Sequence, residues 1–314
     1  MAFAAADSTP APADGSTAPD ESASNSSENN SSTNKNRPDA KKPKSKEYYI
    51  NSDFDRYFQA DEVKKLLAGE TEFSALFRDD MTGRARGVAL FLPDWGLHAA
   101  NNRGIDSLRT LLPDYGWVTL SMSVPSHIEP IHVQAKIQLP SADTPADAPN
   151  VRKPGLKPYI KPSSLRIVNE DYMAAYETQI KLRLQALVTE AQNHQGYFIV
   201  IAQGSSAAAV ASIYAKEELE EPEALIFINA FLPDLALNRK MNQDITVTSI
   251  PTLDIYPSVD RYGLTDNIKI RRKLAIKNFK ASYRQQRLFG DISYHNQNRR
   301  LLKSVYGWLS SLGL

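Results

Sequence analysis

The chain contains no cysteine, and this absence limits its chemistry before any motif is considered. Without cysteine there can be no disulfide bond, no thiolate nucleophile and no zinc site with Cys ligands. Histidine is scarce as well, with five scattered residues and no pair four positions apart to share one face of a helix. We therefore predict neither a metal site nor a cofactor.

An excess of charge of either sign is also missing. The chain has 37 basic and 36 acidic side chains, so its net charge of +1 provides no electrostatic argument for binding nucleic acid or an anionic membrane. No apolar run approaches the roughly 20 residues that a membrane-spanning helix needs. We predict no nucleic-acid partner and no membrane span.

Large apolar residues are almost absent from the first part of the chain. Residues 1–46 consist mainly of Ala, Ser, Thr, Asn, Pro, Asp, Glu and Lys, which predicts a disordered tail. Residues 47–314 remain as one domain. Within this domain, residues 126–164 are rich in proline and polar residues and are too long for a simple connection, so we predict a loop insertion or lid.

The first seven residues, Met1–Asp7, are similar to the small-residue end of a secretory signal whose charged and apolar parts are missing. Together with the lack of cysteine, this similarity predicts a periplasmic or secreted protein. The alternative is a cytoplasmic protein with a disordered tail.

Runs of apolar residues alternate with segments of helical periodicity along the rest of the chain. The central run, 198–201, is followed by small residues and an Ala-rich helix, which indicates a buried parallel strand that turns sharply into a helix. We predict an α/β fold with a mainly parallel, doubly wound sheet. The other predicted strands cover 72–77, 87–92, 117–122, 224–230, 250–257 and 281–288, and the predicted helices cover 60–67, 105–112, 169–193, 268–280 and 296–312.

The turn after the central strand carries the segment Gly204-Ser205-Ser206-Ala207-Ala208. It matches the nucleophile elbow G-x-S-x-G with Ala for the last Gly; in such an elbow a strained turn presents a serine above the sheet. Two serines before an Ala-rich helix can also be simple helix caps. The segment thus predicts either a nucleophile or a cap.

Several segments together resemble the α/β-hydrolase superfamily over residues 60–314. Leu92-Pro93-Asp94-Trp95-Gly96 resembles its first oxyanion loop, which implies oxyanion-hole roles for Trp95 and Gly96. The stretch Pro251–Asp260 resembles its strand followed by the catalytic acid, and His295 resembles its terminal histidine, in the order Ser, Asp, His that this fold uses.

A closer resemblance is to an uncharacterised bacterial family, domain of unknown function 3530. The segments GVALFLPDWG, YGWVTLSMSVP, IPTLDIYPSVD, YRQQRLFG and VYGWL carry it. Aligning strand ends puts Gly204 at the nucleophile position, as this family often has, whereas other registers favour Ser205 or Ser206.

Two functions follow from these registers. In the first, the protein is an exported serine hydrolase of esterase type, acting on a small-molecule or envelope-derived ester. Ser205 or Ser206 attacks, His295 transfers the proton and Asp260 orients the imidazole. In the second, Gly204 replaces the nucleophile and the protein is a catalytically inactive binding or scaffold protein.

Overall fold

The computed structural model describes residues 46–101, 105–125, 170–258, 264–290 and 297–314. The predicted tail 1–46, apart from its last residue, and the predicted insertion 126–164 lie outside these ranges. Among the described helices, none is both long and apolar enough to cross a membrane.

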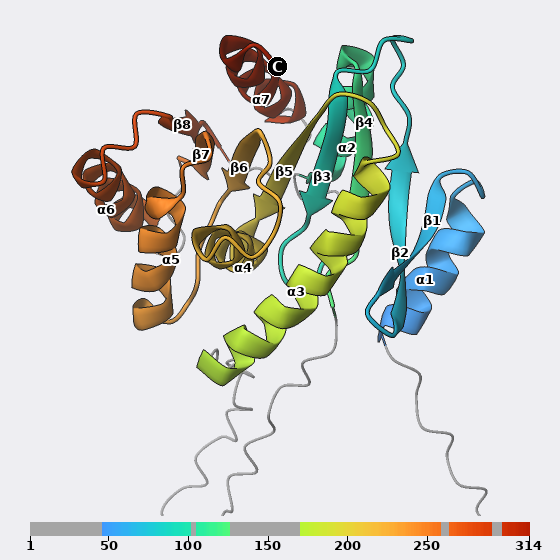
Figure 1. Ribbon diagram of the computed structural model, residues 1–314, viewed down its shortest axis with the longest axis horizontal. Helices are drawn as coiled ribbons and strands as arrows, with labels where there is room; N and C mark the ends of the chain where they lie inside the picture. Colours follow the sequence, from blue (N-terminus) through green and yellow to red (C-terminus); the bar gives the residue numbers. More distant parts are fainter. Residues whose placement is uncertain (1–45, 102–104, 126–169, 259–263, 291–296) are drawn as a thin grey trace, which may run out of the picture. The chain divides into compact units, whose positions relative to one another are not determined.

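One eight-stranded sheet organises the domain (Figure 1). Its order is β1-β2-β4-β3-β5-β6-β7-β8; β1 and β2 pair antiparallel, β2 pairs antiparallel with β4, and all further neighbours are parallel. The predicted mainly parallel α/β sheet is confirmed. The strands are β1 (Val63–Ala68), β2 (Thr71–Arg78), β3 (Gly87–Leu92), β4 (Trp117–Met122), β5 (Tyr197–Gln203), β6 (Ala224–Ile228), β7 (Thr252–Pro257) and β8 (Tyr283–Leu288).

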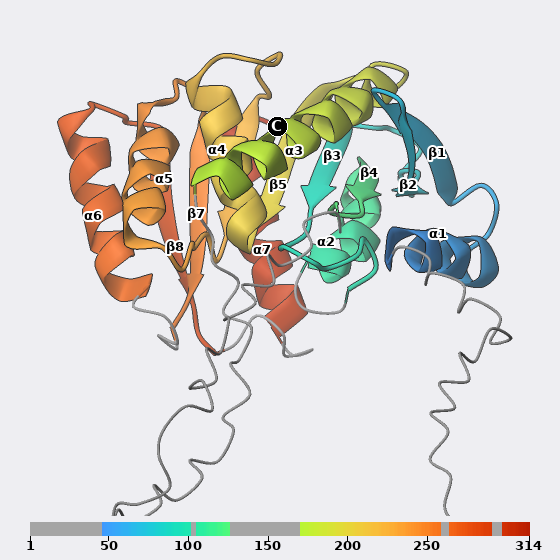
Figure 2. The same ribbon diagram turned by 90° about the horizontal axis from the view of Figure 1, so that it is seen from below.

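Helices cover both faces of the sheet, as continuous apolar strands require. One face carries α3 (Glu170–Ala191), α4 (Gly204–Ala215) and α5 (Leu235–Val247), with α6 (Leu264–Lys277) next to α5 (Figures 1 and 2). The other face carries α2 (Ile105–Leu111), the short 3₁₀ helix η1 (Leu112–Tyr115) and α7 (Asn298–Leu312).

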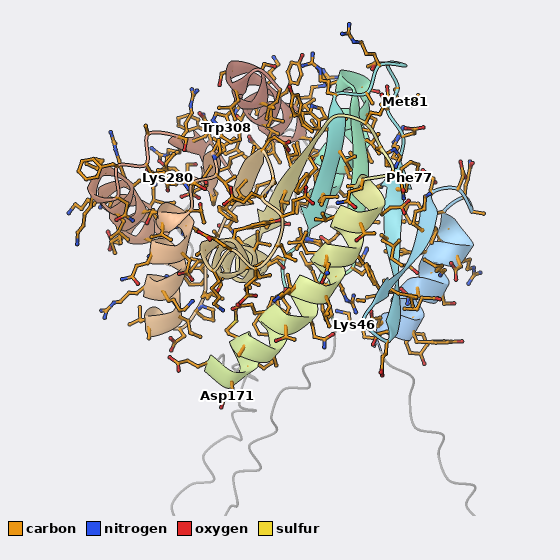
Figure 3. The ribbon with its side chains drawn as sticks, viewed as in Figure 1. Lys46, Phe77, Met81, Asp171, Lys280 and Trp308 are labelled. Carbon is orange, nitrogen blue, oxygen red and sulfur yellow. The ribbon has the colours of Figure 1, made fainter. Side chains whose placement is uncertain are left out.

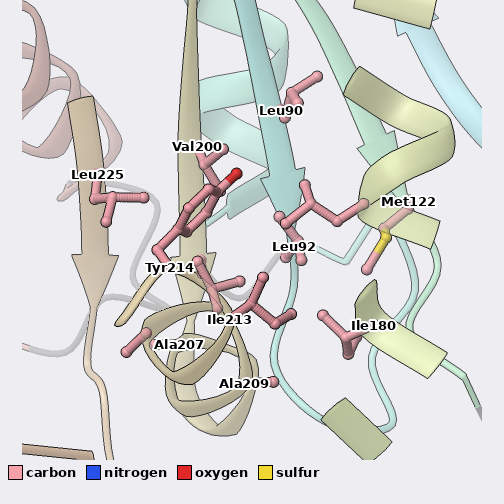
Figure 4. Close-up of a cluster of buried hydrophobic side chains, with 14 of the residues drawn as sticks. Leu90, Leu92, Met122, Ile180, Val200, Ala207, Ala209, Ile213, Tyr214 and Leu225 are labelled. Carbon is pink, nitrogen blue, oxygen red and sulfur yellow. The ribbon is translucent and has the colours of Figure 1, made fainter. Parts of the chain in front are cut away.

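Successive side chains of the central strands point to opposite faces of the sheet and so form two hydrophobic clusters, one on each face. In β5, Val200 and Ala202 pack toward α3 and α4, whereas Ile199 and Ile201 pack toward α2 and α7. Figure 4 shows the first of these clusters, in which Val200 lies near Ile213 and Tyr214 of α4. Because both faces of β5 are buried, the turn after it has its position fixed from both sides.

The N-terminal part of the domain differs from the prediction. The prediction of a helix at 60–67 is wrong, because Val63–Ala68 forms strand β1. This strand pairs with β2 from Val63↔Leu76 to Ala68↔Thr71, and a tight turn at Gly69, which has φ +63°, joins the two strands. The cross-strand partner overrides the local helical pattern. The helix of this region lies earlier, at α1 (Lys46–Tyr57), where Phe54 packs with Leu76 and Ala99.

Candidate functional site

The turn between β5 and α4 has the backbone shape of an elbow. Gln203 is extended, with φ −114° and ψ 144°, and Gly204 turns into the left-handed region with φ +58° before the helix begins. A side chain is strained at such a φ. A Cβ atom at Gly204 would also lie 2.0 Å from Cγ and 2.1 and 2.3 Å from the carboxylate oxygens of Asp94. Both the left-handed backbone and the position of the Asp94 carboxylate therefore favour glycine at position 204.

The Asp94 carboxylate occupies the space above the elbow. Its Oδ1 accepts a hydrogen bond from the backbone N–H of Ser205 at 2.7 Å and another from the backbone N–H of Trp95 at 2.7 Å. One of these donors lies in the first turn of α4 and the other in the loop after β3. Two convergent N–H groups at a helix start are the arrangement that binds an oxyanion. In this protein they bind an anion from the chain itself.

Ser206 points into the core. It is fully buried, its hydroxyl donates to the carbonyl of Pro93 at 2.5 Å, and the Tyr176 hydroxyl of α3 lies 2.7 Å from its Oγ. Because the single Ser206 proton goes to Pro93, Tyr176 is the donor to Ser206. Burial raises the pKa of Tyr176, which keeps its proton in place for this bond. The Ser206 hydroxyl thus ties α4 to the β3 loop and to α3.

Ser206→Ala is expected to lower the free energy of unfolding by about 1–3 kcal/mol, because the Pro93 carbonyl and the Tyr176 hydroxyl each lose a buried partner. Urea denaturation followed by tryptophan fluorescence measures the change. In Tyr176→Phe, the further effect of Ser206→Ala should be smaller, since one of the two bonds is already gone. Equal effects in both backgrounds would contradict the shared network.

Ser205 is the more accessible of the two serines. Its side chain is half-buried, whereas Ser206 has no exposed surface. Ser205 follows Gly204 directly and takes part in the elbow through its backbone N–H. The structure therefore brings Gly204, Ser205 and the Trp95 backbone together around Asp94.

The β3 loop that carries Asp94 is held from two sides. Trp95 stacks on Tyr172 and Tyr176 of α3, with ring centroids 4.5 and 5.2 Å apart. On the other side the Lys46 ammonium group donates to the carbonyl of Gly96 at 2.7 Å. Lys46 lies at the start of α1 and is labelled there in Figure 3. This packing fixes the loop that presents Asp94.

Two of the residues implied by the hydrolase resemblance, Asp260 and His295, lie outside the described residues. The two described histidines contact aromatic rings away from the elbow: the His98 ring packs edge-on against Phe54, and the His194 ring stacks on Phe77. Burial, with the positive charge of Lys46 nearby, lowers the pKa of His98. The described residues contain no group of three His, Asp or Glu side chains that could hold a metal.

Sequence reasoning did not assign a role to Asp94, although it quoted the loop that contains it. The available signal was an acidic residue two positions after the end of a buried strand, at the carboxyl edge of the sheet where this fold places its sites. Tyr176 gave no such signal, because it occupies an ordinary apolar position in the helical pattern of α3.

A separate cavity of about 300 Å³ lies between α3, α4 and α5. Its apolar wall includes Met173, Leu237 and Met241, and at its rim Lys240 pairs with Asp244 at 2.8 Å. This volume is at the lower end of small-molecule sites. Its lining includes neither Asp94 nor Gly204.

Comparison with protein families gives one decisive match. A family model described as "Protein of unknown function (DUF3530)" matches residues 1–311. The chain belongs to the DUF3530 family. The family resemblance predicted from its sequence segments is thereby confirmed. No curated protein sequence matches the chain.

Several solved structures have a fold similar to that of the DUF3530 chain. An alpha-beta serine hydrolase homologue from Coxiella burnetii is 10% identical, with TM-score 0.52 and coverage of 79% of this chain and 99% of that one. Est1E from Butyrivibrio proteoclasticus is 9% identical with the same TM-score and coverage. Dienelactone hydrolase from Anabaena variabilis is 12% identical, with TM-score 0.52 and coverage of 79% and 96%. At this identity the similarity shows the α/β-hydrolase fold alone.

Proposed function

We propose that this DUF3530 protein is a catalytically inactive α/β-hydrolase-fold protein that binds a partner or ligand without cleaving it. One observation supports the proposal above the others: the Cβ of any serine at Gly204 would lie 2.0 Å from Cγ of Asp94. In this proposal Gly204 holds the nucleophile position, and Asp94 fills the space that the nucleophile and the substrate oxygen share in an active enzyme.

The buried position of Ser206 is consistent with this reading. Its hydroxyl is committed to the Pro93 carbonyl and to Tyr176, so attack on a bound ester would require the core of the elbow to open. The cavity between α3, α4 and α5 offers a place for a small ligand that is independent of the elbow.

A second candidate is a serine esterase that uses Ser205. Two observations favour it: Ser205 is half-buried, and it follows the left-handed residue of the elbow directly. In this alternative Ser205 attacks the ester carbonyl, with His295 and Asp260 as the remaining members of the triad. In this register the oxyanion would use the N–H of Ser206, the residue after the nucleophile, together with the N–H of Trp95, and Asp94 already occupies the latter, which makes this candidate the weaker one.

A fluorophosphonate probe distinguishes the two candidates, because only an activated serine reacts with it. We expect the full chain to remain unlabelled under conditions that label an active serine esterase in the same tube. Mass spectrometry of the intact chain reads the result. Labelling that is lost in Ser205→Ala and kept in Ser206→Ala would overturn the proposal in favour of the esterase.

We further propose that the protein acts in the periplasm, with residues 1–46 as a spacer. The small-residue segment Met1–Asp7 and the absence of cysteine support this location. Fractionation of cells that express the complete gene product tests it. Recovery in the cytoplasmic fraction alone would reverse the assignment.

A further inference from the structure

Phe279 lies at the end of α6, and its presence there is not explained by a gain in the stability of the fold. Phe279 has φ 54°, in the left-handed region, and closes the helix with the bonds of a Schellman motif: Lys280 N–H to the Ala275 carbonyl at 2.9 Å and Phe279 N–H to the Ile276 carbonyl at 3.1 Å. Gly or Asn usually occupies this position because a larger side chain is strained there. Yet the Phe279 side chain is 92% exposed, so it gains almost no burial in return.

The backbone on both sides of Phe279 is anchored. Asn278 Nδ2 donates to Thr246 Oγ1 at 3.2 Å, and Lys280 Nζ donates to the carbonyl and hydroxyl of Thr248 at 2.8 and 2.6 Å. Both contacts bind the end of α6 to the end of α5. These bonds fix the backbone on both sides of Phe279, and its side chain projects into solvent.

The exposed side chains around Phe279 are basic and apolar. Lys269, Arg272 and Ile276 follow one another at intervals of three and four residues, which puts them on one stripe of the helix, and Phe279 follows just beyond the last helical residue, Lys277. Ile276 is 70% exposed. With the neighbouring Lys273 and Lys277, these residues define what we call the α6 surface: Lys269, Arg272, Lys273, Ile276, Lys277 and Phe279.

The charges of the α6 surface are mostly unneutralised. Lys269 pairs with Asp266 at 3.2 Å, but no carboxylate of the described residues pairs with Arg272, Lys273 or Lys277. The surface lies at the outer end of the helix row α3, α4, α5, α6, next to the edge strand β8 (Figures 1 and 2). Lys280 is labelled beside it in Figure 3. A net charge of +1 for the whole chain thus conceals a local concentration of positive charge.

We propose that the α6 surface docks on the anionic surface of a lipid bilayer. Phe279 and Ile276 enter the boundary between headgroups and acyl chains, and the basic side chains face the lipid phosphates. A nucleic-acid backbone would use the cations but would leave both apolar side chains in water. A second copy of the chain would bring two cationic surfaces together, which is unfavourable.

Co-sedimentation of the full chain with vesicles tests the proposal. We expect binding to phosphatidylcholine vesicles that contain phosphatidylglycerol and much weaker binding to vesicles of phosphatidylcholine alone. Each basic residue near an anionic surface strengthens binding about fivefold. Arg272→Gln/Lys273→Gln/Lys277→Gln should therefore weaken binding by about a hundredfold.

A matched control removes the same charge elsewhere. Arg299, Arg300 and Lys303 are exposed on α7, on the other face of the sheet, and Arg299→Gln/Arg300→Gln/Lys303→Gln should keep most of the binding. Phe279→Asn separates docking from folding, because Asn adopts the left-handed region more readily than Phe. This variant should unfold at the same or a higher urea concentration and bind vesicles about tenfold more weakly, since a buried aromatic side chain is lost from the bilayer.

Three results would overturn the proposal. The first is no binding of the unaltered chain to the phosphatidylglycerol vesicles. The second is an equal loss in the α6 and α7 triple variants, which would indicate non-specific attraction. The third is a concentration-dependent dimer in light scattering that Phe279→Asn abolishes, which would assign the surface to a second copy.

Discussion

Gly204→Ser is expected to lower the free energy of unfolding by about 3–5 kcal/mol, a large loss for a change of one small residue. The left-handed backbone contributes about 1–2 kcal/mol, because Gly204 has φ +58°. The remainder comes from Asp94, whose carboxylate must leave the two N–H groups of Trp95 and Ser205 to make room. Hydrogen bonds to a charged group are worth about 1.5–3 kcal/mol. Urea denaturation measures the change.

Two other glycines separate these contributions. Gly83 has φ +68° with no atom within 4 Å of an added Cβ, so Gly83→Ser isolates the backbone strain. Gly307 lies in α7 without a left-handed φ and also has open space, and Gly307→Ser should change stability by less than about 0.5 kcal/mol. If Gly204→Ser costs no more than Gly83→Ser, then Asp94 does not fill the elbow.

A double variant tests the same contact directly. Asp94→Ala alone should cost about 1.5–3 kcal/mol, since it removes both hydrogen bonds to the carboxylate. In Gly204→Ser/Asp94→Ala the loss should fall short of the sum of the single losses by a similar amount, because both changes remove the same bonds. Additive losses would contradict the steric exclusion of a serine by Asp94.

Arg271→Met is expected to destabilise the domain by about 3–5 kcal/mol, because it leaves the carboxylate of Asp254 buried without its counterion. Both side chains are fully buried, and Arg271 Nη1 lies 2.9 Å from each Asp254 oxygen. Arg271 also donates to the Ala230 carbonyl at 2.6 Å and to Asn242 Oδ1 at 2.8 Å. One guanidinium group thus ties α6 to α5, β7 and the end of β6.

The exposed pair in the same helix provides the control. Lys269 and Asp266 lie 3.2 Å apart with side chains 67% and 83% exposed, so Lys269→Met should cost less than about 1 kcal/mol. Adding Asp254→Asn to Arg271→Met should recover part of the stability, because the uncompensated charge is removed while the Tyr283 hydroxyl, 2.7 Å from Asp254 Oδ2, keeps a partner. A double variant less stable than Arg271→Met would contradict this account.

The sequence predicted the central strands accurately and the edge of the sheet less well. Strands β3 and β4 begin and end where the apolar runs predict, since both of their faces are buried and most of their positions carry apolar side chains. Strand β1 was predicted as a helix, because an edge strand carries polar residues on its open side and only the pairing with β2 reveals its conformation. Local pattern is a reliable guide where burial is complete.

For the candidate site, the sequence by itself determined the residue types at the turn after β5 and in the loop after β3, together with the family that these segments resemble. It left Gly204, Ser205 and Ser206 open as nucleophile candidates, because a shift of one residue is invisible in a run of small side chains. Only the tertiary structure decided that the left-handed φ belongs to Gly204, that Ser206 faces Tyr176 and that Asp94 reaches the N–H of Ser205. Asp94 and Ser205 are 111 positions apart, and no local pattern specifies a contact that the parallel pairing of β3 and β5 creates.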